Sequence, residues 1–367
     1  MKKNAHLNGA LEICGEYIYN KKVTFPPAIK DQFVHNLNIN DSFFDSLKED
    51  YEEFEEWFNK ISLEGRRCWV YLNEIGSIGA LLIYKFENES IDSNPQLPAK
   101  KRLKISTFKV THTGYKIGEL FLKLSLEFSI KNNLDEIYLT SFTKPNDYLA
   151  NLIMEYGFYP KARNRRGEDI YIKELAVDKE KIQHFSPTEI AKKFYPIFYD
   201  GIEVKKFLIP IRPEYHDRLF SEYKLRQTIL PEHHGEFIVE GNTIKKAHFI
   251  NSKNQKILPG DILLFYRTFD RKEITSLGIT NKVFLNVKDE DVIMKNVGKR
   301  GVHEITKTTK KPAMVILFTW HLHLARPMKL IDLKEMHISP KSISLIPHEK
   351  YLMIKRKGGV DERYTVH

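Results

Sequence analysis

The sequence contains only two cysteines, Cys14 and Cys68, among its 367 residues. Two thiols are too few for a disulfide framework, and they lack the paired spacing of a zinc site. Long apolar runs are also missing, so we expect no membrane span. Asn8, Glu12 and Glu16 interrupt the N-terminal twenty residues, which argues against a secretory signal. The sequence therefore predicts a cytoplasmic protein that binds no membrane and uses neither cysteine functionally.

Charge is distributed unevenly along the chain, because basic side chains outnumber acidic ones in the second half. Residues 1–30 carry 5 basic and 2 acidic side chains, residues 31–177 carry 19 and 23, and residues 178–367 carry 34 and 23. The net charges of these segments are +3, −4 and +11, so the positive excess belongs to the C-terminal half. A concentrated positive charge indicates a polyanionic partner for that half.

The length indicates two domains, because single hydrophobic cores stop growing at roughly 250–300 residues. Changes in composition and the positions of turn-forming residues place the boundaries. We expect an N-terminal extension over residues 1–30, a first domain over 31–177, a connector over 178–230, a second domain over 231–355 and a basic tail over 356–367.

Hydrophobic periodicity predicts the order of elements in the first domain. From residue 42 to 63, apolar residues recur every three or four positions, which indicates one or two amphipathic helices. The pattern then predicts strands over 67–72, 78–86 and 102–110, a helix over 118–132, a strand over 136–141, a helix over 146–156 and two strands within 157–175.

A glycine-containing loop joins the predicted strand 102–110 to the following helix. Residues 113–123 read TGYKIGELFLK. Free backbone N–H groups and the positive end of a helix together form an anion site, and glycine lets a pyrophosphate approach. Taken alone, this motif fits an ordinary strand-to-helix turn equally well.

The loop resembles the phosphate-binding motif of the GNAT family of N-acetyltransferases, usually written Arg/Gln-x-x-Gly-x-Gly/Ala. Gly118 matches, and the Gly157-Phe158 pair resembles the family's closing Tyr-x-x-x-Gly-Phe signature. The resemblance covers about residues 31–177 and implies an α+β fold with a mixed sheet flanked by helices. It also implies acyl transfer from acetyl-CoA. Thr113 and Lys116 depart from the motif, standing where the family has Arg or Gln and the middle Gly.

The resemblance implies two sets of coenzyme contacts. Backbone groups of Phe108, Lys109 and Val110 would pair with the pantetheine arm. The pyrophosphate would be held by Thr113, Gly114, Tyr115, Lys116, Ile117 and Gly118. Splayed strand ends would admit the acyl group.

Catalysis requires an acid for the leaving thiolate and a base for the ammonium nucleophile. The family's tyrosine, counted from Ala150, falls on Met154, which cannot donate a proton. Tyr156 is the candidate acid, with a packing role as the alternative. His112 is the candidate base because its unperturbed pKa suits the task, with a structural hydrogen bond as the alternative.

Four short β-rich runs between residues 233 and 324 predict a small β-barrel with helical insertions. Their motifs resemble the PUA-like superfamily, particularly its ASCH and EVE branches, over about residues 231–355. The resemblance rests on Gly260, Asp261, Phe265, Tyr266, Arg267 and Gly278. It implies binding of RNA, or of a base or modified base.

A basic surface interleaved with aromatic residues suits phosphates and stacked bases. The alternative is that these lysines are merely solvated. The candidate nucleic-acid contacts are Asn242, Thr243, Lys245, Lys246, Tyr266, Arg267 and Trp320.

His321 and His323 alternate along a predicted strand, so we expect them to share one face. No third ligand stands at usable spacing, and we therefore expect no metal site.

The leading hypothesis is an acetyl-CoA-dependent N-acetyltransferase with a PUA-like domain that binds nucleic acid, RNA in preference to DNA, or a modified base. Its acceptor would be an RNA-linked or nucleic-acid-associated amine. Two alternatives stay open. One is a catalytically degenerate domain within a nucleic-acid or modified-base reader. The other is an acetyltransferase for a protein or small amine, such as a toxin–antitoxin or defence accessory.

Overall fold

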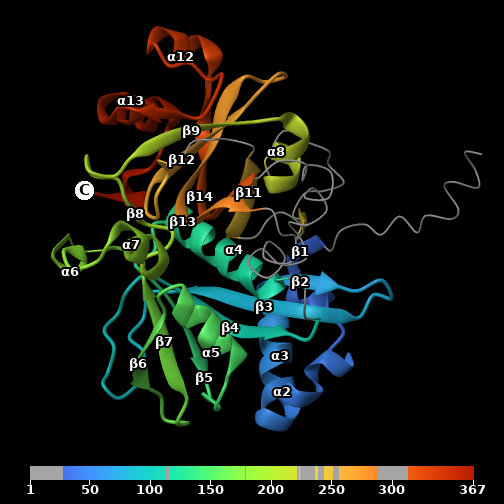
Figure 1. The fold of residues 1–367 in the computed structure, drawn as a ribbon. Coiled ribbons are helices and arrows are strands. Elements are labelled where there is room, and N and C mark those ends of the chain that lie inside the picture. Colours follow the sequence, from blue (N-terminus) through green and yellow to red (C-terminus); the bar gives the residue numbers. More distant parts are fainter. Residues whose placement is uncertain are drawn as a thin grey trace, which may run out of the picture.

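The computed structural model describes residues 28–112, 116–177, 179–220, 223, 236–238, 244–250, 256–287 and 313–367. Two large sheets form two units that lie one above the other, and helix α4 (Ile117–Lys131) runs between them (Figure 1). The fold is mixed α+β. No described helix has the length and apolar character of a membrane span.

The first sheet has eight described strands in the order β10-β1-β2-β3-β4-β5-β7-β6. Their bounds are β1 Ala28–Phe33, β2 Arg67–Leu72, β3 Ile78–Glu87, β4 Arg102–Val110, β5 Glu136–Ser141, β6 Tyr159–Arg163, β7 Asp169–Glu174 and β10 Glu236–Ile238. Strands β4 and β5 are parallel, whereas every other neighbouring pair is antiparallel. The strands predicted from the first domain's periodicity are confirmed, and β1 and β10 are additions to them.

Helices cover both faces of this sheet. The sheet's larger apolar cluster packs under α4 and α5 (Tyr148–Glu155), where Asp147 caps α5 by accepting the backbone N–H of Leu149. The other face is covered by α2 (Asp45–Asp50) and α3 (Phe54–Leu63), whose Phe54 and Phe58 pack with Phe44. The predicted helices in residues 42–63, 118–132 and 146–156 are confirmed within three residues at each end.

The second sheet has the order β11-β14-β13-β12-β9-β15. Its strands are β9 Lys206–Ile211, β11 Lys245–Ile250, β12 Ile262–Arg267, β13 Glu273–Val287, β14 Ala313–Lys329 and β15 Ser344–Ile346. The expectation of a small barrel is corrected here, because within the described residues β11 and β15 are the open edges of the sheet. Strand β9 comes from the predicted connector. Its sequence contains Pro210, and proline obscures a strand pattern.

The remaining elements pack around the second sheet. They are α6 Lys179–Ile182, α7 Pro187–Lys193, β8 Phe198–Tyr199, α8 Pro213–Leu219, α12 Leu330–Glu335, α13 His348–Gly358 and β16 Thr365–Val366. The predicted basic tail is partly structured, since α13 ends at Gly358 and β16 pairs with β8. The side chains of Thr365 and Val366 are buried there. The domain boundaries themselves stay predictions.

Candidate functional site

Strands β4 and β5 pair only at their beginnings. Arg102 lies opposite Glu136, and the register continues only to Ile105 opposite Leu139. The rest of β4, residues 106–110, pairs with β3 on its other side but has no strand partner on the β5 side among the described residues. Backbone N–H and C=O groups along this open edge are therefore available to a ligand.

A buried ion pair fixes the closed end of this opening. Arg102 Nε donates to Glu136 Oε2 at 2.8 Å, and both side chains are buried. The guanidinium also donates to the carbonyls of Glu89 and Pro98, at 3.0 and 2.7 Å. Further along β4, the register with β3 shifts between Ile83 and Tyr84. Such a bulge bends the strand locally. The opening therefore has a closed end fixed by the ion pair and an edge that is bent.

The N-terminus of α4 lies just beyond the end of β4. Lys116 is its N-cap residue, has φ +53°, and provides no side-chain hydrogen bond to the first turn. The N–H groups of that turn can therefore bind an anion. A Cβ atom at Gly118 would lie 2.9 Å from Leu152 Cδ2, so glycine lets α4 and α5 approach closely. The predicted contacts Thr113, Gly114 and Tyr115 lie outside the described residues.

The predicted pantetheine contacts Phe108, Lys109 and Val110 occupy the open part of β4. The Phe108 ring packs edge-on against Phe121 of α4, with 5.7 Å between centroids. Lys109 points to the opposite face, where its ammonium donates to the Phe43 carbonyl and to Ser46 Oγ. Burial lowers the pKa of Lys109. Because the side chains are used elsewhere, only the backbone of this segment faces the opening.

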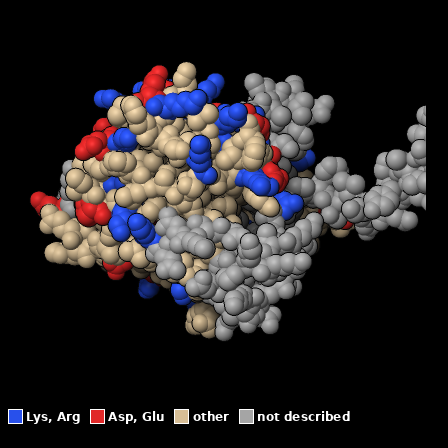
Figure 2. Space-filling model, turned by 45° about the horizontal axis from the view of Figure 1, so that its top comes forward, with Lys and Arg blue, Asp and Glu red and all other residues tan. Residues whose placement is uncertain are grey.

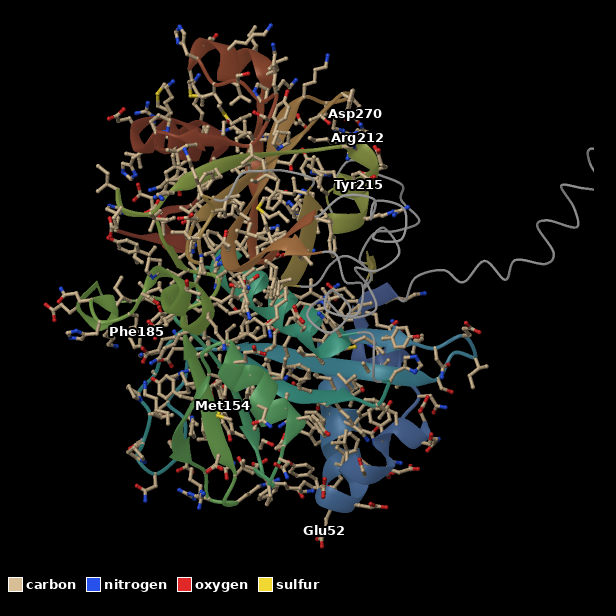
Figure 3. The ribbon with its side chains drawn as sticks, in the orientation of Figure 1. Glu52, Met154, Phe185, Arg212, Tyr215 and Asp270 are labelled. Carbon is tan, nitrogen blue, oxygen red and sulfur yellow. The ribbon has the colours of Figure 1, made fainter. Side chains whose placement is uncertain are left out.

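Tyr156, the candidate acid, is buried where the two units meet. Its ring is 5.6 Å from that of Tyr195, and the Lys245 ammonium lies 5.9 Å from its centroid. Burial and the neighbouring Glu119 carboxylate raise the pKa of Tyr156 well above its ordinary value. A tyrosine in this environment stays protonated but is a weak proton donor. Met154, which replaces the family's tyrosine, is partly exposed on α5 (Figure 3).

His112, the candidate base, lies at the end of β4. Its backbone N–H donates to the Gly79 carbonyl at 3.0 Å, and its ring lies 5.4 Å from that of Tyr71. The ring is half-buried beside the start of the coenzyme loop. The structure thus gives Tyr156 and His112 separate surroundings, and both catalytic assignments stay predictions.

The predicted nucleic-acid residues of the second unit fall into two groups. Lys245 is half-exposed, and its ammonium pairs with Glu155 of α5 at 2.5 Å. Lys246 points the other way, is buried, and lies 5.5 Å from the Phe220 ring. Asn242 and Thr243 lie outside the described residues.

The predicted nucleic-acid contacts Tyr266 and Trp320 are part of the core. Tyr266 is 3% exposed and Trp320 1% exposed, so neither ring presents a face to solvent. The Trp320 ring instead accepts the Lys123 ammonium of α4, at 3.8 Å from its centroid. These two residues do not offer a stacking surface in this conformation, because they fill the interior of the second unit.

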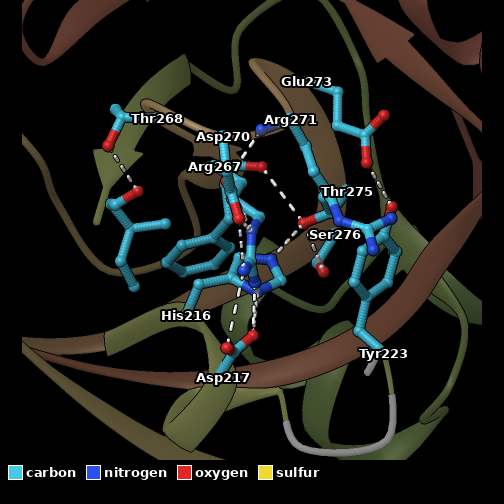
Figure 4. Close-up of polar contacts among 12 residues, drawn as sticks. His216, Asp217, Tyr223, Arg267, Thr268, Asp270, Arg271, Glu273, Thr275 and Ser276 are labelled. Atoms are coloured by element: carbon cyan, nitrogen blue, oxygen red, sulfur yellow. Dashed lines mark hydrogen bonds and ion pairs between the residues drawn. The ribbon is translucent and has the colours of Figure 1, made fainter. Parts of the chain in front are cut away.

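Arg267 belongs to a buried polar network (Figure 4). Its guanidinium pairs with Asp217 and Asp270 and donates to His216 Nδ1 at 3.1 Å. Because arginine can only donate, His216 Nδ1 must accept. Burial, together with the charge of Arg267, lowers the pKa of His216 to about 3, so the ring is neutral. Its hydrogen is therefore on Nε2, which donates to Thr275 Oγ1 at 2.7 Å.

The network continues to His323. Thr275 Oγ1 and Ser276 Oγ are 3.0 Å apart, and Ser276 Oγ lies 2.8 Å from His323 Nδ1. Rings of Phe220, Tyr223 and Trp320 surround His323; their centroids lie 4.9–5.7 Å from its own. Sequence reasoning named Arg267 and His323 but did not connect them, and it missed the other members. These come from α8, from the turn between β12 and β13, and from β13, and no local spacing brings them together.

The expectation that His321 and His323 share one face is wrong. The β13–β14 register shifts between Leu277 and Gly278, and this bulge inserts His321 as an extra residue. His321 Nδ1 consequently bonds the Pro196 carbonyl at 2.8 Å, whereas His323 faces Ser276. Among the described residues no group of three potential ligands forms a metal site.

Charge on the described surface is mixed. On the face seen in Figure 2, lysine and arginine side chains alternate with acidic ones and do not gather in one patch. Ion pairs such as Lys357 with Asp332, 3.7 Å apart, also bring both signs together in the second unit. The net positive charge of the C-terminal half is therefore dispersed over the described part of this face.

No protein-family model matches the sequence, and no curated protein does. Solved structures resemble it in parts. The ASCH protein from Zymomonas mobilis is 16% identical, with a TM-score of 0.31, over 41% of this chain and 94% of its own. A GNAT-family acetyltransferase from Listeria monocytogenes is 17% identical, with a TM-score of 0.25, over 34% and 71%. A chain of the NatC complex bound to Gag peptide and CoA is 17% identical, with a TM-score of 0.26, over 39% and 95%.

These likenesses establish no family. Each spans part of the chain at low identity, so the function has to be argued from the geometry of the two units.

Proposed function

We propose that this chain is an acetyl-CoA-dependent N-acetyltransferase whose second unit binds RNA and presents an RNA-linked amine. The observation that carries the proposal is the opening between β4 and β5 beside the N-terminus of α4, where the N-cap residue Lys116 provides no side-chain hydrogen bond to the first turn. Coenzyme A combines an extended arm with amide groups, which matches the open strand edge, and a pyrophosphate, which matches the N-terminus of the helix. Backbone groups do both tasks, so the departures at Thr113 and Lys116 are compatible with coenzyme binding.

The coenzyme would supply an activated thioester. Residues 106–110 of β4 would hold its arm through backbone hydrogen bonds, and the first turn of α4 would neutralise the pyrophosphate. The acceptor ammonium would lose one proton before the amine attacks the thioester carbonyl, and the nitrogen would lose a second proton as the amide forms. The departing thiolate would take up one proton and leave as the thiol of coenzyme A. We propose His112 as the base that accepts a proton from the ammonium, and Tyr156 as the acid that protonates the thiolate. Because Tyr156 is buried, solvent is the alternative proton donor.

The charge of the second half of the chain supports a nucleic-acid acceptor. Segment 178–367 has a net charge of +11. A concentrated positive charge favours a polyanionic partner.

A reader without catalysis is the second candidate, and the burial of Tyr156 favours it. The residue that would protonate the thiolate has a raised pKa and packs against Tyr195. Such a protein would bind coenzyme A or nucleic acid without transferring an acetyl group.

A labelled-acetyl assay separates these possibilities. The full-length protein is incubated with isotopic acetyl-CoA and separate pools of RNA, DNA and protein. We expect label in RNA, and we expect much of it to disappear in Lys246→Glu, which reverses a buried charge in the second unit. Label only in protein would contradict the nucleic-acid part of the proposal. No label in any pool, together with measurable coenzyme A binding, would favour the reader.

A further inference from the structure

Helix α4 contacts the second unit at three positions along its length. In its first turn, Glu119 Oε1 accepts the backbone N–H of Lys245 at 2.8 Å. One turn later, the Lys123 ammonium lies 3.8 Å from the Trp320 centroid. At its end, the Ile130 carbonyl accepts a hydrogen bond from Arg363 at 2.5 Å. The second unit therefore fixes the position of the helix whose N-terminus faces the proposed coenzyme site (Figure 1).

Glu119 and Lys123 act from one face of α4, because residues four apart lie above one another on a helix. Both side chains are buried, with Lys123 only 1% exposed. Their contacts are also neighbours. Lys245 begins β11 and lies opposite Thr319 of β14, and the Trp320 N–H donates to the carbonyl of Ile244 at 2.8 Å. One face of one helix thus holds the start of β11 and the middle of β14, where these two strands pair.

Those strands lead to the proposed nucleic-acid residues. Lys245 and Lys246 open β11, and the Trp320 ring lies 4.9 Å from the His323 ring, which bonds Ser276. The Lys245 ammonium reaches back to Glu155, the last residue of α5, and α5 packs on Gly118 through Leu152. The first turn of α4 and the start of β11 are therefore joined by direct contacts, some of them through α5.

We propose that Glu119 and Lys123 are positioning residues that couple coenzyme binding to nucleic-acid binding, so that each ligand tightens the other. The proposal rests on the proposed function. A pyrophosphate at the N-terminus of α4 stabilises the first turn, which carries Glu119. Nucleic acid on β11 immobilises Lys245, the partner of Glu119. Both ligands thus favour the same docked arrangement, and thermodynamic linkage makes the effect reciprocal.

The sign of the coupling distinguishes this device from simple proximity. Coenzyme A and RNA are both polyanions, and on a rigid scaffold two nearby anions weaken each other's binding. Mutual tightening therefore requires that the first ligand orders the contacts between the units, so that the second ligand binds with a smaller loss of conformational entropy. We expect a coupling factor of about fivefold or more.

The test is a set of calorimetric titrations with the full chain at one salt concentration. Coenzyme A is titrated into free protein and into protein saturated with a single-stranded RNA oligonucleotide, and RNA is titrated with and without coenzyme A. Glu119→Ala removes the acceptor for Lys245, and Lys123→Met keeps the length of the side chain but removes its charge. Glu119→Gln retains an acceptor, and Lys131→Met is the control because Lys131 is exposed on the same helix.

We expect the coupling factor to be kept in wild type, Lys131→Met and Glu119→Gln. In Glu119→Ala and Lys123→Met the coupling factor should fall close to one while both ligands still bind. A merely structural role would weaken both affinities and leave their ratio unchanged, which would overturn the inference. Independent or mutually weakening ligands in wild type would also overturn it, with the proposed function intact. If neither ligand binds wild-type protein, the proposed function and the inference built on it both fail.

Discussion

Gly157 is a residue whose missing side chain lets two parts of the molecule touch. Its φ is +82°, and a Cβ atom there would lie 1.7 Å from the carbonyl oxygen of Lys193, the last residue of α7. That distance is far inside van der Waals contact. The match to the Gly-Phe signature therefore marks a structural requirement as well as a resemblance.

We expect Gly157→Ala to lower the free energy of unfolding by about 3 kcal/mol or more, because backbone strain and a steric clash add. Gly167→Ala is the matched control. Gly167 has nearly the same φ, +84°, but nothing lies within 4 Å of the position of its Cβ, so it should lose only about 1 kcal/mol. Urea denaturation of both variants measures the difference. Equal losses would show that the contact with Lys193 is unimportant.

Lys173 is a buried cation at the same junction. Its ammonium donates to the Lys193 carbonyl at 3.1 Å, and burial lowers the pKa of Lys173 to about 7. In the unfolded chain the pKa is about 10.4. Between these two values the unfolded state binds more protons than the native state, so stability rises with pH across this window.

Lys173→Met should remove this dependence. One proton corresponds to at most about 1.4 kcal/mol per pH unit, and the variant should lose up to that slope between pH 7 and 9. Denaturation at pH 7, 8 and 9 provides the measurement, with Lys131→Met as an exposed control. Parallel pH profiles for wild type and Lys173→Met would contradict the assignment.

At the scale of elements, the β4–β5 pair depends on the ion pair at its closed end. Removing Glu136 would leave the Arg102 guanidinium buried with only carbonyl partners and an exposed lysine nearby. A broken buried pair typically costs about 3–5 kcal/mol. The closed end of the opening, which lies before Ile105, should then no longer be held in place.

We therefore expect Glu136→Ala to destabilise the protein by about 3 kcal/mol or more and to weaken coenzyme A binding together with stability. Asp92→Ala is the control, since Asp92 pairs with Arg165 at 2.8 Å with both side chains exposed, and such pairs contribute about 0–1 kcal/mol. Chemical denaturation and calorimetry report the two effects. A loss for Glu136→Ala no larger than that for Asp92→Ala would show that this pair does not hold the strands.

Local periodicity predicted the elements of the first unit because each strand and helix there carries its own apolar pattern. The strand 102–110 and the strand 136–141 coincide with β4 and β5. Strand β9 was missed because Pro210 interrupts its pattern, and the bulge at His321 was missed because a register shift is set by the partner strand. The opening between β4 and β5 was expected from the resemblance alone.

At the scale of the whole molecule, the site depends on contacts that no local pattern encodes. The network from Arg267 to His323 joins α8, β12, β13 and β14, and Lys123 reaches Trp320 across nearly 200 positions of sequence. Tyr156 and Trp320 looked like an acid and a stacking ring in the sequence. Packing of the two units against α4 places both in the interior.

The central claim is that the N-terminus of α4 and the open edge of β4 bind coenzyme A. Calorimetric titration of coenzyme A into wild type, Lys116→Glu and Lys131→Glu tests it most directly. The two variants change charge equally at opposite ends of one helix, at Lys116, its N-cap, and at Lys131, its last residue. We predict one coenzyme per chain, binding weakened about tenfold or more in Lys116→Glu and less than twofold in Lys131→Glu. No binding to wild type, or equal weakening in both variants, would contradict the account.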